Sequence, residues 1–152
     1  MLRQRFGLLF ILSLGLLAAA SPVLRDDDVA AEDKKFEGTW TVTGMEVNGE
    51  KLGEDSYGNQ TFTFKGKEYI QKAGDDVVEA GTQDLRPNKK PKEMDIHVKE
   101  GQTKGQLQLA IYEIEGDELK MCAAQHGEKE RPTEFKTKPG SGHMLFTMKR
   151  KK

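Results

Sequence analysis

The residues that could ligate a metal ion or attack a substrate are few and scattered along the chain. There are three histidines and one cysteine among 152 residues. Cys122 and His126 have a C-x3-H spacing, and Asp95 lies two residues before His97, but no second pair completes a tetrahedral set of ligands. Ser141 lies between two glycines, yet the Gly-x-Ser-x-Gly elbow of a serine nucleophile is absent. We therefore predict no metal site, no cofactor and no catalytic residue, and we do not expect an enzyme.

Cys122 is alone, so an intrachain disulfide is impossible, and its apolar neighbours favour a buried small side chain over a reactive thiol. Glu113 has the strand parity of nearby apolar residues, so it is either a buried carboxylate or a residue exposed to water. The basic loop at residues 89–92 and the pair Arg131-Pro132 either position an anionic partner or are solvated loops. Without residues 1–20, which contain two arginines and no acid, the net charge changes from −1 to −3, and this mildly acidic balance argues against nucleic acid as a partner.

Short strands must position these residues, because apolar and polar residues alternate with a period near two from Thr39 onward. Turn signals such as Asn48-Gly49 and Gly116-Asp117 separate the segments. The predicted strands span 39–47, 60–64, 68–72, 77–85, 93–99, 106–115, 118–124 and 143–150. The strand at 106–115 has apolar residues on both parities, so either both faces are covered or a bulge reverses them.

Sequential antiparallel strands joined by short turns form a meander, and closing a meander into a barrel removes its two unpaired edges. We therefore predict an all-β fold, an eight-stranded antiparallel up-and-down barrel over residues 36–150, followed by a basic tail at 151–152. A sandwich of two sheets stays open as the alternative, because periodicity does not report closure.

The interior of an eight-stranded barrel is either filled by side chains or holds one small ligand. Methionines at inward positions 94, 121, 144 and 148 suit irregular spaces and adaptable surfaces. The candidate ligand-binding residues are Phe62, Phe64, Ile96, Met121 and Phe146. One hypothesis is a module that binds a small hydrophobic or amphipathic ligand. The alternative is a structural or protein-interaction domain of the cell envelope with a filled core and an envelope protein as partner.

The N-terminus has the pattern of a signal peptide. Two arginines precede an apolar run at residues 6–17, and the alanines at 18–20 provide a cleavage site. Cleavage after residue 20 removes two positive charges and no acid, which changes the net charge from −1 to −3. Residues 21–35 are then an acidic linker, with a short helical turn at 30–36. We expect an exported protein without stable membrane insertion after cleavage; an uncleaved membrane anchor is the alternative.

Two motifs at the ends of the predicted barrel carry a family resemblance. Gly38-Thr39-Trp40 heads the first strand and Arg150 ends the last, and this resembles the lipocalin and calycin pattern. In those barrels the tryptophan packs across one end of the barrel and the late arginine lies over it. The resemblance implies a lipocalin-like barrel in which Gly38, Trp40 and Arg150 are structural closure residues, with any working site elsewhere.

Nearly the whole mature domain is also similar to an exported domain family of unknown function that is expanded in planctomycete bacteria. The segments that carry this similarity are 36–40, 88–96, 111–119, 130–135 and 138–143. The resemblance implies the same lipocalin-like barrel, and it implies no activity.

Overall fold

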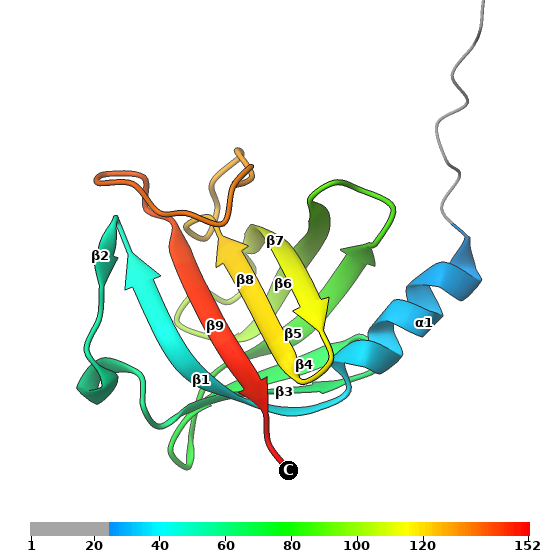
Figure 1. Ribbon diagram of the computed structural model, residues 1–152, viewed down its shortest axis with the longest axis horizontal. Coiled ribbons are helices and arrows are strands. Elements are labelled where there is room, and N and C mark those ends of the chain that lie inside the picture. Colours follow the sequence, from blue (N-terminus) through cyan, green and yellow to red (C-terminus); the bar gives the residue numbers. More distant parts are fainter. Residues whose placement is uncertain (1–24) are drawn as a thin grey trace, which may run out of the picture.

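The first and last strands of the barrel pair with each other and close the sheet. The computed structural model describes residues 25–152. Its strands form one antiparallel sheet in the order β2-β1-β3-β4-β5-β6-β7-β8-β9, with an additional β1–β9 pairing (Figure 1). Eight strands make the barrel and β2 is an extra strand beside β1, so the predicted all-β barrel is confirmed. The predicted signal peptide at 1–20 and residues 21–24 of the predicted linker lie outside the described residues.

The strands begin and end within two residues of the predicted positions. Their bounds are β1 Gly38–Val47, β3 Gln60–Lys65, β4 Glu68–Ala73, β5 Asp76–Arg86, β6 Lys92–Gly101, β7 Leu107–Glu115, β8 Glu118–Ala123 and β9 Met144–Arg150. The sequence does not predict β2 (Glu50–Lys51) or the short 3-10 helix η1 (Glu54–Ser56). Two or three residues are too few to show a period.

A helix occupies most of the region expected to be an acidic linker. The helix α1 spans Asp26–Phe36, so it begins four residues before the predicted helical turn. Its first turn is acidic and its last turn is basic, which suits the helix dipole. The Phe36 ring packs edge-to-face against Phe64 and Tyr112, so the helix belongs to the barrel domain. No helix in residues 25–152 is long and apolar enough to cross a membrane.

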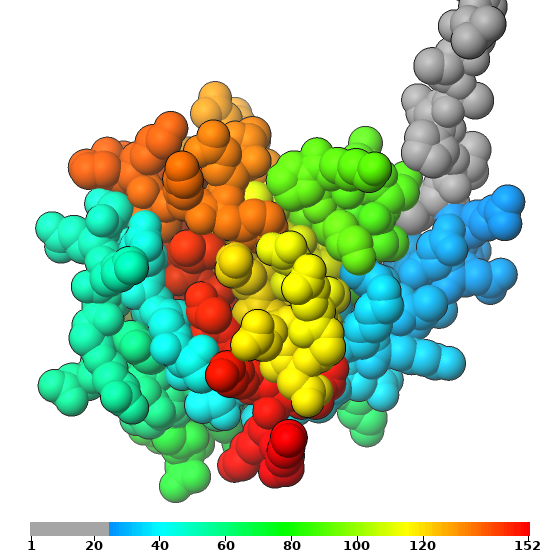
Figure 2. Space-filling model, viewed as in Figure 1, coloured from blue at the N-terminus to red at the C-terminus, as the bar shows by residue number. Residues whose placement is uncertain are grey.

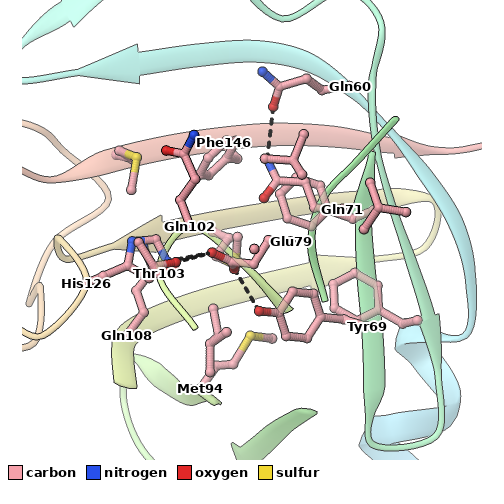
Figure 3. A pocket seen from close by; sticks show the side chains of 18 of the residues that line it. Gln60, Tyr69, Gln71, Glu79, Met94, Gln102, Thr103, Gln108, His126 and Phe146 are labelled. Carbon is pink, nitrogen blue, oxygen red and sulfur yellow. Dashed lines mark hydrogen bonds and ion pairs between the residues drawn. The ribbon is translucent and has the colours of Figure 1, made fainter. Parts of the chain in front are cut away.

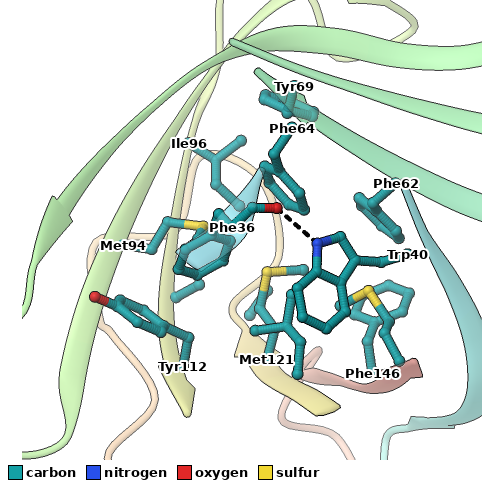
Figure 4. Close-up of a cluster of buried hydrophobic side chains, with 14 of the residues drawn as sticks. Phe36, Trp40, Phe62, Phe64, Tyr69, Met94, Ile96, Tyr112, Met121 and Phe146 are labelled. Carbon is teal, nitrogen blue, oxygen red and sulfur yellow. Dashed lines mark hydrogen bonds between the residues drawn. The ribbon is translucent and has the colours of Figure 1, made fainter. Parts of the chain in front are cut away.

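Aromatic side chains plug the end of the barrel beside α1 (Figure 4). Trp40 and Phe36 are 0% exposed, and the indole Nε1 donates a hydrogen bond of 2.7 Å to the Phe36 carbonyl. The guanidinium carbon of Arg150 lies 4.3 Å from the centroid of the Trp40 ring. The same guanidinium donates hydrogen bonds to the carbonyl oxygens of Lys35 and Glu37. One side chain therefore joins β9 to β1 and to the end of α1.

Both faces of β7 are covered at its centre, and no bulge reverses its parity. Ala110 and Tyr112 belong to the barrel core, whereas Ile111 faces outward and is still buried. The pairings of β7 with β6 and β8 run without a register shift. Arg131 reaches over this face and donates a hydrogen bond of 2.7 Å to the Ala110 carbonyl. Glu113 is on the outward face and its side chain is 49% exposed, so it is not a buried carboxylate.

Replacing Arg150 with alanine removes the stack on Trp40 and the bonds to α1. We expect the free energy of unfolding to fall by about 1–2 kcal/mol in urea titration. The matched control is Lys149→Ala, because the Lys149 side chain is 63% exposed and makes only a 4.0 Å contact with Glu118. An Arg150→Ala protein as stable as the control would contradict this role of the arginine in closure.

Glu32 makes the attachment of α1 sensitive to acid. This buried carboxylate binds Nζ of Lys35 at 2.8 Å and Nζ of Lys92 at 2.6 Å, and it accepts a hydrogen bond of 3.1 Å from the Tyr112 hydroxyl. Burial alone would raise the pKa of Glu32, but the two lysines outweigh it and the pKa lies below its ordinary value of 4.5. The unfolded chain therefore takes up this proton more readily than the folded one.

The stabilisation from Glu32 should be complete above the ordinary glutamate pKa and should be lost as the pH falls through the folded-state pKa. We expect Glu32→Gln to be less stable than the native protein at neutral pH, with a difference that shrinks in acid. Urea titrations from neutral pH into acid measure this, with the exposed Glu113→Gln as control. A difference that stays constant with pH would refute the assignment.

Candidate ligand-binding cavity

A cavity of about 740 Å³ opens at the end of the barrel opposite Trp40. Its walls come from β1, β3, β4, β5, β6, β7, β8 and β9 and from the loops after β6 and β8. Its apolar lining consists of Met45, Phe62, Phe64, Val77, Val78, Met94, Ile96, Met121, Met144 and Phe146. Val77 and Val78, at the mouth, are 51% and 44% exposed. The barrel interior is therefore hollow at one end and plugged at the other.

All five residues predicted to contact a ligand line this cavity: Phe62, Phe64, Ile96, Met121 and Phe146. They come from β3, β6, β8 and β9, and their inward positions follow from alternation along each strand. Among the inward methionines of the prediction, Met148 is the exception. It is completely buried and does not line the cavity.

A group of polar side chains lies on one wall of the cavity, and the sequence analysis did not identify it. The Tyr69 hydroxyl donates a hydrogen bond of 2.7 Å to Oε1 of Glu79, and the Thr103 hydroxyl donates one of 2.9 Å to Oε2. Nε2 of His126 lies 2.9 Å from the same Oε2. Figure 3 shows these three side chains around the Glu79 carboxylate. We call this group the Glu79 cluster.

The contact between His126 and Glu79 is an ion-pair contact that lowers the pKa of the carboxylate. Nε2 of His126 is buried and has no partner in good hydrogen-bond geometry within the described residues. The imidazole therefore carries unused hydrogen-bonding capacity beside the cavity.

Burial alone would raise the pKa of Glu79, but the contacts with His126, Tyr69 and Thr103 outweigh burial and lower the pKa below its ordinary value. Burial and the neighbouring carboxylate both raise the pKa of Tyr69. At neutral pH the cluster therefore consists of an ionised carboxylate, 8% exposed, that accepts hydrogen bonds from two neutral hydroxyls.

A bulge in β5 places Glu79 at the mouth of the cavity. Gln71 pairs with Glu79 and Lys72 pairs with Val77, so Val78 is the extra residue. The chain of β6 comes close to this bulge at Gly101, whose φ is +111°. A Cβ at residue 101 would lie 2.6 Å from the Val78 carbonyl oxygen, and only glycine avoids this contact.

Glutamines complete the polar part of the lining. The side-chain amide of Gln71 donates a hydrogen bond of 3.1 Å to the Gln60 side chain, and that of Gln108 donates one of 2.8 Å to the Ala124 carbonyl. Gln102 adds a further amide from the loop after β6. These amides surround the cavity with neutral donors and acceptors.

His126 belongs to the β8–β9 segment, residues 124–143, which is fixed against the barrel wall (Figure 2). Arg131 donates hydrogen bonds of 2.9 Å and 2.7 Å to the carbonyls of Met94 and Ala110 and pairs with Asp95. The Thr137 hydroxyl accepts a hydrogen bond of 2.8 Å from the Gly49 amide. Arg131 is therefore neither solvated nor available to an anionic partner. Both interpretations of Arg131 from the sequence, a solvated loop residue and a residue that positions an anionic partner, are wrong.

The other residues considered for chemistry lie apart from the cavity. Lys92, the last residue of the predicted basic loop, begins β6 and pairs with Glu32. His97 does not line the cavity, and its Nε2 lies 3.1 Å from Oδ2 of Asp84. Cys122 is buried, as predicted, and burial raises the pKa of its thiol to about 11. Residues 25–152 contain no group of three or more metal-ligating side chains.

No protein-family model, curated protein or solved structure matches this chain. The function must therefore be argued from the cavity itself.

Arg131 should hold the β8–β9 segment, and with it His126, in place. We expect Arg131→Ala to lower the free energy of unfolding by about 2 kcal/mol, because its hydrogen bonds involve a largely buried charge. Hydrogen–deuterium exchange across residues 124–143 should accelerate. Lys129→Ala, an exposed position of the same segment, should change neither quantity. Unchanged exchange in the arginine variant would mean that other contacts fix the segment.

Proposed function

We propose that this protein binds a small amphipathic molecule inside the barrel. The observation that carries the proposal is the cavity of about 740 Å³, with an apolar floor and a polar cluster on one wall. Binding pockets for small molecules commonly have volumes of about 300–1,000 Å³ and combine apolar walls with a few placed polar groups. The lipocalin-like sequence pattern supports the same function.

The cavity favours binding over the alternative of a structural domain with a filled core. Large side chains from β3, β8 and β9 could have filled the space, as they do at the Trp40 end. Instead, the methionines at 45, 94, 121 and 144 line an open volume, and flexible methionine side chains adapt to ligands of irregular shape. The N-terminal pattern suggests that binding takes place after export, in the cell envelope or outside the cell.

We propose binding rather than catalysis because of how the hydroxyls in the cavity are engaged. Those of Tyr69 and Thr103 both donate to Glu79. The lowered pKa of Glu79 makes its carboxylate a weak base, and the raised pKa of Tyr69 makes its hydroxyl a weak acid. This arrangement suits recognition of a ligand better than proton transfer.

Fluorescence of the neutral probe N-phenyl-1-naphthylamine tests the proposal. Saturable binding to the native protein is expected. Met144→Trp should weaken binding by at least about tenfold, because the larger ring occupies the cavity near its mouth. The matched control is Ile70→Trp, since Ile70 is 40% exposed and does not line the cavity.

Absence of saturable probe binding to the native protein would overturn the proposal. Equal binding by Met144→Trp and Ile70→Trp would also overturn it, because the probe would then occupy another surface.

A further inference from the structure

The surroundings of Glu79 differ from those of two other carboxylates with little exposure, Glu32 and Asp95. Glu32 binds two lysines, and Asp95 binds Arg86 and Arg131. Within the described residues, each of these two carboxylates thus has two permanently charged basic partners. Glu79 is 8% exposed, but no lysine or arginine of residues 25–152 is recorded within ion-pair distance of it.

The groups that Glu79 does contact leave its charge incompletely balanced. Its aligned donors are the hydroxyls of Tyr69 and Thr103, which are neutral. The imidazole of His126 lies 2.9 Å from Oε2, and an imidazole, unlike a lysine or arginine, carries charge only when protonated. A carboxylate in a largely apolar cavity is costly unless a cation compensates it.

The formal charge of the cavity lining is also negative. Among the described residues that line the cavity, Glu79 is the only carboxylate and none is a lysine or arginine. An anionic head group entering the cavity would meet this carboxylate without a fixed positive charge to offset the repulsion. A cationic head group would supply the missing partner.

The Glu79 carboxylate also has the capacity to accept a further hydrogen bond. A carboxylate can accept about four hydrogen bonds. Oε1 accepts one, from Tyr69, while Oε2 has both Thr103 and His126 nearby. Oε1 therefore keeps accepting capacity for a donor from a ligand.

We propose that the ligand is an amphipathic cation, with a protonated amine that binds the carboxylate of Glu79 and an apolar part that packs on Phe62, Met121 and Phe146. This inference rests on the proposed function, because it assumes that the cavity holds a ligand. It excludes fatty acids and other anionic amphiphiles as preferred ligands. The ammonium N–H groups donate hydrogen bonds to the ionised carboxylate.

Three probes with the same chain length and different head groups test this inference: decylamine, decanol and decanoate. Each is titrated at neutral pH, below its aggregation concentration, against the native protein carrying N-phenyl-1-naphthylamine. Displacement of the fluorophore reports the affinity of each compound. We expect the affinity of decylamine to be at least about tenfold higher than that of decanol, and that of decanoate to be the lowest.

The variant Glu79→Gln keeps the shape of the side chain and removes its charge. Its affinity for decylamine should fall by at least about tenfold, to that of decanol, while its affinity for decanol stays within about twofold of the native value. Glu113→Gln, which removes an exposed outward charge, should leave all three affinities unchanged. If Glu79→Gln does not fold, the order of the three probes on the native protein decides the question.

The outcomes separate this inference from the proposed function. If decanol or decanoate binds the native protein as tightly as decylamine, the cavity binds ligands but the charge assignment is wrong. An undiminished affinity of Glu79→Gln for decylamine would also refute the assignment. If neither the fluorophore nor any of the three compounds binds saturably, the proposed function itself is refuted.

Discussion

The guanidinium of Arg150 holds together the parts of the chain that must meet for this barrel to close. It stacks on Trp40 of the first strand, donates hydrogen bonds to the carbonyls of Lys35 and Glu37, and pairs with Asp117 in the β7–β8 turn at 3.0 Å. Because these contacts and the aromatic plug fill one end of the barrel, that end cannot admit a ligand. The space inside the barrel is left at the opposite end, where side chains from the strands and from two loops surround it. Closure at one end thus determines where a binding site can form.

The open end of the barrel combines apolar side chains, whose burial stabilises the fold, with a buried charge, whose desolvation destabilises it. Apolar side chains form the floor, yet an ionised carboxylate is buried among the wall residues. At Glu32 and Asp95 the chain offsets such a charge with lysine or arginine. At Glu79 the partners are two hydroxyls and an imidazole. This arrangement lowers the pKa of the carboxylate without a lysine or arginine beside it, and it is the basis of the proposal that the Glu79 cluster recognises a positively charged ligand.

The barrel strands and the apolar floor could be predicted from the sequence, because alternation with period two reports which side chains face inward. The Glu79 cluster could not be predicted from alternation in the same way. Glu79 is an even number of residues from the buried Leu85, so alternation along β5 would place its side chain inside the barrel. The two adjacent valines of the bulge, Val77 and Val78, interrupt this alternation in the sequence. Thr103 and His126 come from loops, which have no period. The helix α1 is longer than predicted, because a run of acidic residues suggests a solvated linker. Acidic residues in the first turn and lysines in the last turn also favour a helix.

The central claim, that the open end of the barrel receives an amphipathic cation, is tested most directly by NMR of methionine methyl groups during titration with decylamine. Four methionines line the cavity, namely Met45, Met94, Met121 and Met144. Met148 lies in the same core but outside the cavity, and it serves as an internal reference. The account predicts saturable shifts of the four lining methyl signals, contacts from the alkyl chain to Met121, and a much smaller response of Met148. Shifts of similar size for all five signals, or no saturable shift of the four lining signals, would contradict it.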